Sequence, residues 1–165
     1  MNTVALAVMR LQPLHRGHQL IIDTMLREAQ TAIVVIGSLG AADERNPFSY
    51  EQRMRMIEAL YPNELRLRVL GVRDIGAPDK AAWAAYVLEQ IELAGLPAPT
   101  CYYAGNEEDA SWLQSALPVR IVDRASLGRG ISATAVRSAL AAGLDTQGQV
   151  PPEVLAVIKD EKNGH

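Results

Sequence analysis

Short apolar runs alternate with amphipathic stretches along most of this chain. Runs of four to eight apolar residues bounded by turn residues are typical of buried strands. Five such runs predict strands at Thr3–Met9, Ala32–Gly37, Leu65–Val72, Thr100–Gly105 and Val119–Val122. The third run alternates at its start between apolar and polar residues, so we expect it near an edge of a sheet.

The segments between these runs carry apolar residues at helical spacing. In the segment 17–30, Ile21, Ile22 and Met25 fall on one stripe, with charged residues opposite. Ser49 followed by Gln52 is a capping-box signature, and Asp79 and Ser132 are also good N-cap residues. The pattern predicts helices over residues 17–30, 50–61, 80–94, 110–116 and 133–142, and a last helix that begins at Pro151–Pro152.

Strand and helix alternate five times, which predicts an α/β fold. We expect a Rossmann-like, doubly wound, five-stranded parallel sheet with helices on both faces. The 165 residues predict a single domain over positions 1–165. Such sheets bind ligands beyond the carboxyl ends of their strands, so the loop after the first strand is a natural candidate site.

Composition narrows the classes of partner. A net charge of −3 argues against a nucleic-acid-binding surface. The first apolar run is far too short to span a membrane, so we expect neither nucleic acid nor membrane as a partner. Cys101 is the only cysteine, which excludes an intramolecular disulfide. Together with the lack of an N-terminal signal segment, this predicts a cytoplasmic protein.

The loop after the first strand contains "HRGH", residues 15–18, and three kinds of chemistry fit two histidines there. A zinc site needs three or four ligands, but the only other histidine is His165. A general base needs a nucleophile, and the chain has no Gly-x-Ser-x-Gly elbow. A phosphate site fits best, because Gly17 lets the backbone approach a ligand and His18 falls at a helix N-terminus. The plain alternative is that His18 caps or packs and His15 is a solvated loop residue.

A second stretch, "ISATAVR" at residues 131–137, supports the phosphate interpretation. Ser132 and Thr134 lie at a predicted helix N-terminus, and Arg137 follows about one turn later. Hydroxyls, free backbone N–H groups and a guanidinium together bind anions well. The alternative is an ordinary serine N-cap with an exposed arginine.

These two motifs resemble the "HxGH" and "ISxTxxR" signatures of a nucleotidyltransferase superfamily. The opening "RLQPLHRGH" is similar to the "GRFQPxHxGH" start of archaeal-type nicotinamide mononucleotide adenylyltransferases. The stretch "IGSLGAADERNPFSYEQRMRMI" resembles a segment of the same family, and the resemblance runs from about Val4 to Leu140. Bifunctional relatives carry a second, Nudix hydrolase domain, which we do not expect in this chain.

The resemblance implies adenylyl transfer from ATP to nicotinamide mononucleotide, which gives NAD and pyrophosphate. It implies Mg²⁺ held mainly by the ATP phosphates, no metal ligated by the protein alone, and a homo-oligomer. By motif match it implies catalytic roles for His15, His18 and Arg137; ATP phosphate contacts for Arg10, Arg45, Ser132 and Thr134; adenosine contacts for Gly105 and Asn106; and nicotinamide contacts for Trp83 and Asp74.

Alternatives remain for several of these residues and for the function. Trp83 fits core packing as well as ring stacking, Asp74 can simply shape its loop, and Arg45 can be a solvated charge. The "NEED" stretch at residues 106–109 is expected to be a solvated turn, and Trp112 receives no role. Other acceptors such as nicotinate mononucleotide fit the same scaffold, and a non-catalytic nucleotide sensor is the alternative from another class.

Overall fold

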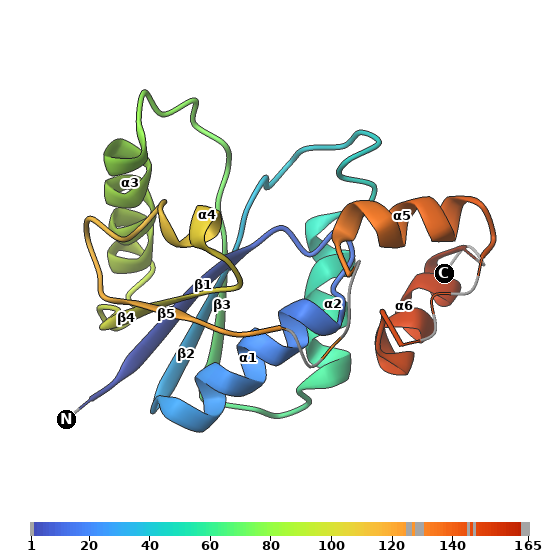
Figure 1. Ribbon diagram of the computed structural model, residues 1–165, viewed down its shortest axis with the longest axis horizontal. Helices are drawn as coiled ribbons and strands as arrows, with labels where there is room; N and C mark the ends of the chain where they lie inside the picture. The colour runs from blue at the N-terminus through green and yellow to red at the C-terminus, as the bar shows by residue number, and fades with distance from the viewer. Residues whose placement is uncertain (1, 125–126, 128–130, 145, 147, 163–165) are drawn as a thin grey trace.

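A five-stranded, all-parallel sheet forms the centre of the protein (Figure 1). The computed structural model describes residues 2–124, 127, 131–144, 146 and 148–162. The strands are β1 (Val4–Met9), β2 (Thr31–Ile36), β3 (Leu67–Gly71), β4 (Cys101–Ala104) and β5 (Val119–Ile121). Their order in the sheet is β3-β2-β1-β4-β5, so the chain reverses its direction of travel across the sheet between β1 and β4. The switch point of this order lies between β1 and β4, and doubly wound sheets bind ligands at such a point.

Helices cover both faces of the sheet, as the sequence predicts. They are α1 (Arg16–Glu28), α2 (Tyr50–Leu60), α3 (Lys80–Leu93), α4 (Glu107–Ala110), α5 (Ala133–Ala141) and α6 (Pro152–Lys162). In Figure 1, α1 and α2 lie on one side of the strands, and α3 and α4 lie on the other. Two separate apolar clusters match these two layers, and α6 packs against α2 at the edge of the first.

The central strands β1 and β2 are almost wholly apolar, so both of their faces can be buried beneath helices. In β1, Ala5 and Ala7 point into the cluster beneath α1 and α2, whereas Val4 and Leu6 point into the cluster beneath α3. The edge strand β3 is partly exposed, which confirms the wetter face predicted for it.

The caps confirm most of the predicted helix starts. The Gln52 N–H donates to Ser49 Oγ at 3.1 Å, and the Ser49 N–H donates back to Gln52 Oε1 at 2.7 Å. Asp79 and Ser132 cap α3 and α5. The helix predicted over residues 110–116 was wrong in its bounds, because Asn106 Oδ1 accepts from the Asp109 N–H at 2.8 Å and starts α4 earlier.

A buried arginine joins three of these elements. Arg53, in α2, is only 1% exposed. Its Nη1 donates to the carbonyl oxygens of Arg10 (3.0 Å) and Gly37 (2.8 Å), and its Nε donates to that of Ser49 (3.2 Å). Arg10 and Gly37 directly follow β1 and β2, so one guanidinium ties the carboxyl ends of two strands to the start of α2.

We expect Arg53→Met to lower the free energy of unfolding by about 3 kcal/mol, because it removes three partly buried hydrogen bonds from a charged donor. Urea unfolding of the variant and the unmodified protein measures the loss. The matched control is Arg55→Met on the exposed side of the same helix, where we expect a change within about 0.5 kcal/mol. Equal losses in the two variants would contradict the bridging role of Arg53.

Candidate active site

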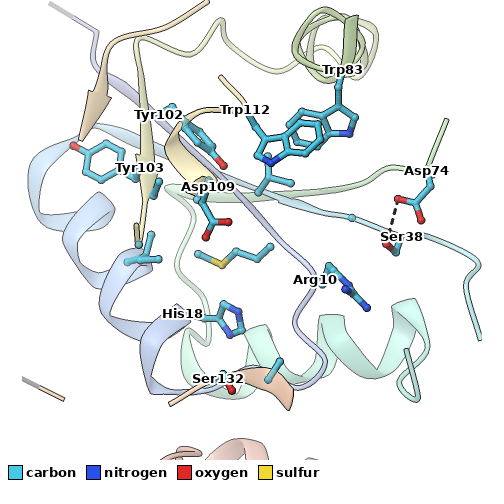
Figure 2. Close-up of a pocket in the computed structure, with 18 of the residues that line it drawn as sticks. Arg10, His18, Ser38, Asp74, Trp83, Tyr102, Tyr103, Asp109, Trp112 and Ser132 are labelled. Atoms are coloured by element: carbon cyan, nitrogen blue, oxygen red, sulfur yellow. Dashed lines mark hydrogen bonds between the residues drawn. The ribbon is translucent and has the colours of Figure 1, made fainter. Parts of the chain in front are cut away.

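A cavity of about 610 Å³ opens at the carboxyl ends of the strands. Residues from β1 and β4, from the loops that follow the strands and from the helices line it, as expected for the switch point. Figure 2 shows Trp83 and Trp112 at one end of this cavity and His18 and Ser132 at the other. Of the residues predicted from sequence, the cavity brings together Arg10, His15, His18, Asp74, Trp83, Gly105 and Ser132.

The two histidines cap the helix that they begin. His15 is the N-cap of α1, and its Nδ1 accepts from the Gly17 N–H at 3.0 Å. The His15 N–H in turn donates to Nδ1 of His18 at 3.1 Å. Because a backbone N–H donates to each Nδ1, the proton of each neutral ring is on Nε2. Both imidazoles therefore keep one N–H donor that the cap does not use.

The histidines are held neutral by their surroundings. Their rings stack with centroids 3.8 Å apart. Burial, and then the nearby charge of Arg124, lower the pKa of His15 to about 4. Burial also lowers the pKa of His18 well below its ordinary value, with His15 and Arg124 contributing in the same direction. His15 is only 3% exposed, so the suggestion of a solvated loop residue was wrong.

Arg124 is a cavity residue that sequence reasoning missed. It lies next to both histidines and to Gly17 and Gly105. A Cβ added at Gly17 would clash with Arg124 Nη1 and would lie 2.8 Å from Cε1 of His15. A Cβ at Gly105 would lie 3.4 Å from Arg124 Nε. The glycine of "HRGH" therefore makes room for a guanidinium, not only for a ligand. The signal in the sequence was an arginine two residues after the fifth predicted strand.

Three predicted phosphate ligands form a second basic group beside the cavity. Arg10 Nη2 donates to Asn46 Oδ1 at 2.9 Å and to the Arg45 carbonyl at 3.1 Å. Arg137 Nη1 donates to the Gln12 carbonyl at 2.8 Å. Burial lowers the pKa of Arg137, and the charges of Arg10 and Arg45 lower it further. The charges of Arg10 and Arg45 therefore both act on Arg137, although of the three only Arg10 lines the cavity.

The start of α5 brings hydroxyls to the same end. Ser132 Oγ accepts from the Ala135 N–H at 3.1 Å, so its own hydroxyl proton is free to donate into the cavity. Thr134 Oγ1 accepts from Arg137 Nη2 at 3.4 Å and lies outside the lining.

The opposite end of the cavity is aromatic and acidic. Trp83, from α3, and Trp112, from the turn after α4, both line it, and so does Asp74 from the loop after β3. The Ser38 hydroxyl donates to Asp74 Oδ1 at 3.2 Å. Trp112 is thus a cavity residue for which no role was predicted from the sequence.

The "NEED" stretch divides between two roles. Asn106 caps α4 through its Oδ1 and does not line the cavity, whereas Gly105, the residue before it, does. Asp109 also lines the cavity, and Figure 2 shows its carboxylate pointing toward the interior. Desolvation there raises the pKa of Asp109. The whole stretch is exposed, which confirms the expected solvation, and Asp109 in addition contributes to the cavity wall.

Within the described ranges, no three histidine, cysteine, aspartate or glutamate side chains are grouped as a metal site would need. Similarly, none of the described helices is long and apolar enough to cross a membrane. The predictions of no protein-bound metal, a cytoplasmic location and a homo-oligomer stay predictions.

Comparison with known proteins identifies the family. Residues 10–77 match a family model described as cytidylyltransferase-like. The chain is 30% identical over 155 residues to the nicotinamide-nucleotide adenylyltransferase of Methanocorpusculum labreanum, covering 93% of this chain and 88% of that protein. The chain belongs to the nicotinamide-nucleotide adenylyltransferase family. A second member, from Thermococcus kodakarensis, is also 30% identical, over 162 residues that cover 95% of this chain and 82% of that protein.

A solved structure shares the fold of this chain. A bifunctional NMN adenylyltransferase/ADP-ribose pyrophosphatase from Francisella tularensis superposes with a TM-score of 0.79 at 20% identity. The match covers 96% of this adenylyltransferase-family chain and 49% of the Francisella protein, so this chain spans about half the length of that bifunctional protein. At this identity the likeness confirms the Rossmann-like fold.

The low pKa of His15 predicts a loss of stability in mild acid. An unfolded histidine takes up a proton below a pH of about 6.5, whereas folded His15 resists protonation down to about 4. Stability is therefore present above the unfolded pKa and falls as the pH drops from 7 to 5, by about 2 kcal/mol for this residue.

Urea unfolding at pH 7 and pH 5 measures this loss. The control variant is His15→Asn, since asparagine can still cap α1 but does not titrate in this range. We expect its loss between the two pH values to be smaller by about 2 kcal/mol. The same pH dependence in both proteins would contradict a buried neutral His15.

Proposed function

We propose that this protein transfers the adenylyl group of ATP to nicotinamide mononucleotide, forming NAD and releasing pyrophosphate. A phosphate oxygen of the mononucleotide bonds to the α-phosphorus of ATP, and the bond from that phosphorus to the oxygen bridging to the β-phosphate breaks. One observation carries the proposal: a single cavity joins an end rich in N–H donors, at His15 and His18, to an end built from two indoles.

The donor-rich end supports binding of the triphosphate. The Nε2–H groups of His15 and His18 and the Arg10 guanidinium favour phosphoryl oxygens, and the positive end of the α1 dipole adds to their attraction. Arg124 adds a further cation that the cavity exposes. We assign to His18 the stabilisation of charge that develops at the α-phosphate, since such preorganised donors are worth most in the transition state.

The residues at the edge of this end complete the proposed ATP site. Ser132 offers its hydroxyl, and Arg137, Thr134 and Arg45 are assigned to the β- and γ-phosphates, which extend beyond the lining described above. Gly105 is assigned to the adenosine, and so is Asn106, whose amide N–H groups are not used by the α4 cap.

The aromatic end suits the nicotinamide ring. Trp83 is assigned to stacking on the ring, and Asp74, oriented by Ser38, is assigned to its carboxamide. The substrate phosphate is already an anion and needs no protein nucleophile. Catalysis by this site then consists of positioning the two substrates and stabilising the transferring group.

A divalent cation, Mg²⁺ by our assignment, is expected to enter with ATP. The lining contains two carboxylates, Asp74 and Asp109, and they come from different elements. Mg²⁺ commonly keeps several waters and binds through substrate phosphates with one or two carboxylates. The cavity fits that mode, in which the cation neutralises part of the charge on the triphosphate.

Turnover with a panel of acceptors tests the function. We would supply ATP, Mg²⁺ and one of nicotinamide mononucleotide, nicotinate mononucleotide, flavin mononucleotide or phosphopantetheine, and measure pyrophosphate release. We expect release with nicotinamide mononucleotide and NAD among the products. Release only with another acceptor would overturn the substrate, and ATP binding without release in any mixture would favour a nucleotide sensor.

Removing His18 is expected to lower kcat by roughly 10²–10³, as for loss of one preorganised donor. The comparison uses His18→Ala and His18→Asn, because asparagine can still accept the bond from the His15 N–H. We expect both variants to lose kcat, while the asparagine variant keeps the unfolding midpoint of the unmodified protein. Near-normal kcat in His18→Asn would remove this residue from the transition state.

Trp83→Ala is expected to raise KM for nicotinamide mononucleotide about tenfold, by loss of ring stacking, and to leave KM for ATP within about twofold. Trp83→Phe, which keeps an aromatic face, is the matched control and should lie close to the unmodified protein. Steady-state kinetics with each substrate varied in turn separate the effects. An equal rise in both KM values would favour a packing role for Trp83.

A further inference from the structure

Two indoles from different helical segments meet at one end of the cavity. Trp83 and Trp112 lie edge to face, with ring centroids 5.4 Å apart and an interplanar angle of 68°. Trp83 is partly buried against the core cluster beneath α3, whereas Trp112 remains 38% exposed. A large aromatic side chain that stays exposed at the wall of a cavity is available to a ligand. We call this pair, Trp83 and Trp112, the aromatic corner.

The charge near the aromatic corner is negative on the cavity side. Asp74 lines the same end, and its carboxylate is held by the Ser38 hydroxyl at 3.2 Å. The cationic side chains among the described lining residues are Arg10 and Arg124. Arg124 belongs to the phosphate end, since it lies next to the histidines, whereas Arg10 lies beside Gly37, between the two ends. The phosphate end therefore holds Arg124, whereas Asp74 is the charged group drawn on the side of the indoles.

Lys80 fixes the position of Trp112 from outside the cavity. Its Nζ donates to Ser111 Oγ at 2.6 Å and lies 5.4 Å from the centroid of the Trp112 ring. Lys80 is not among the residues that line the cavity. Its contact links the start of α3 to the turn that carries Trp112, so the aromatic corner is built before any ligand arrives.

We propose that Trp112 is a specificity-determining residue, and that the aromatic corner with Asp74 recognises the positive charge of an oxidised pyridinium ring. Indole faces attract cations, and a nearby carboxylate adds to that attraction. The oxidised nicotinamide ring carries a formal positive charge, whereas the reduced dihydropyridine ring is neutral and of nearly the same size. The site therefore favours oxidised over reduced nicotinamide mononucleotide. This inference rests on the proposed function.

The ratio of two specificity constants tests the proposal. We would measure kcat/KM for adenylyl transfer to oxidised and to reduced nicotinamide mononucleotide, with NAD and NADH as the products. We expect the unmodified protein to favour the oxidised form by about tenfold, within the range of a desolvated cation–π contact supported by a carboxylate. Trp112→Leu should lower that ratio by about threefold or more, because leucine keeps apolar contact but lacks a π face.

Two further variants separate charge recognition from packing. Trp112→Phe keeps an aromatic face and should hold the ratio within about twofold of the unmodified protein. Asp74→Asn keeps an oxygen for the Ser38 hydroxyl but removes the charge, so it should lower the ratio as Trp112→Leu does. Where Trp112→Leu fails to fold, the asparagine variant still supplies the test. A purely structural role for Trp112 would change both specificity constants equally and leave their ratio unchanged.

The outcomes distinguish this inference from the function on which it rests. Turnover of both ring forms with a ratio near one in the unmodified protein would overturn charge recognition and leave adenylyl transfer standing. An unchanged ratio in both Trp112→Leu and Asp74→Asn would overturn the assignment to these residues. No turnover of either form, despite ATP binding, would overturn the proposed function and this inference with it.

Discussion

The site depends on one buried positive charge. Arg53 lies almost wholly inside the protein and donates to carbonyl oxygens at the ends of β1 and β2 and at the start of α2. A charged group costs several kcal/mol to bury unless its hydrogen bonds are well satisfied, so its position strongly constrains the three segments around it. Those segments carry Arg10 and lead into Ser38, and both of these residues line the cavity. One guanidinium thus holds the two segments that bring Arg10 and Ser38 to the cavity wall.

Helix capping determines the chemistry of the two histidines. Because backbone N–H groups occupy both Nδ1 atoms, His15 and His18 can only donate through Nε2 while they are neutral. Burial lowers the pKa of both rings and keeps them neutral near pH 7. A neutral donor can approach a phosphate without first losing a tightly held water shell, and an arriving triphosphate favours protonation by its own charge. The capping hydrogen bonds therefore stabilise the start of α1 and also fix which nitrogen of each imidazole can donate to a ligand.

Sequence patterns predicted the fold well because its strands and caps are local features. Apolar runs marked all five strands, and side-chain caps such as Ser49 marked the helix starts. The site was harder to predict, since its missing members are joined only by the fold. Arg124 meets Gly17 across more than a hundred residues of chain, and Trp112 looked like any exposed aromatic. The sequence does carry a signal for Arg53, because this residue occupies the apolar stripe of its helix at helical spacing from Met56 and Ile57.

The central claim is that this site works by positioning and electrostatic stabilisation, with direct transfer of the adenylyl group between substrates. The stereochemical course of the reaction tests that claim most directly. ATP made chiral at the α-phosphorus would be converted with nicotinamide mononucleotide, and the configuration at phosphorus in the NAD product determined by NMR. A single in-line transfer predicts inversion. Retention would require two displacements through a covalent adenylyl-enzyme, and would contradict the account.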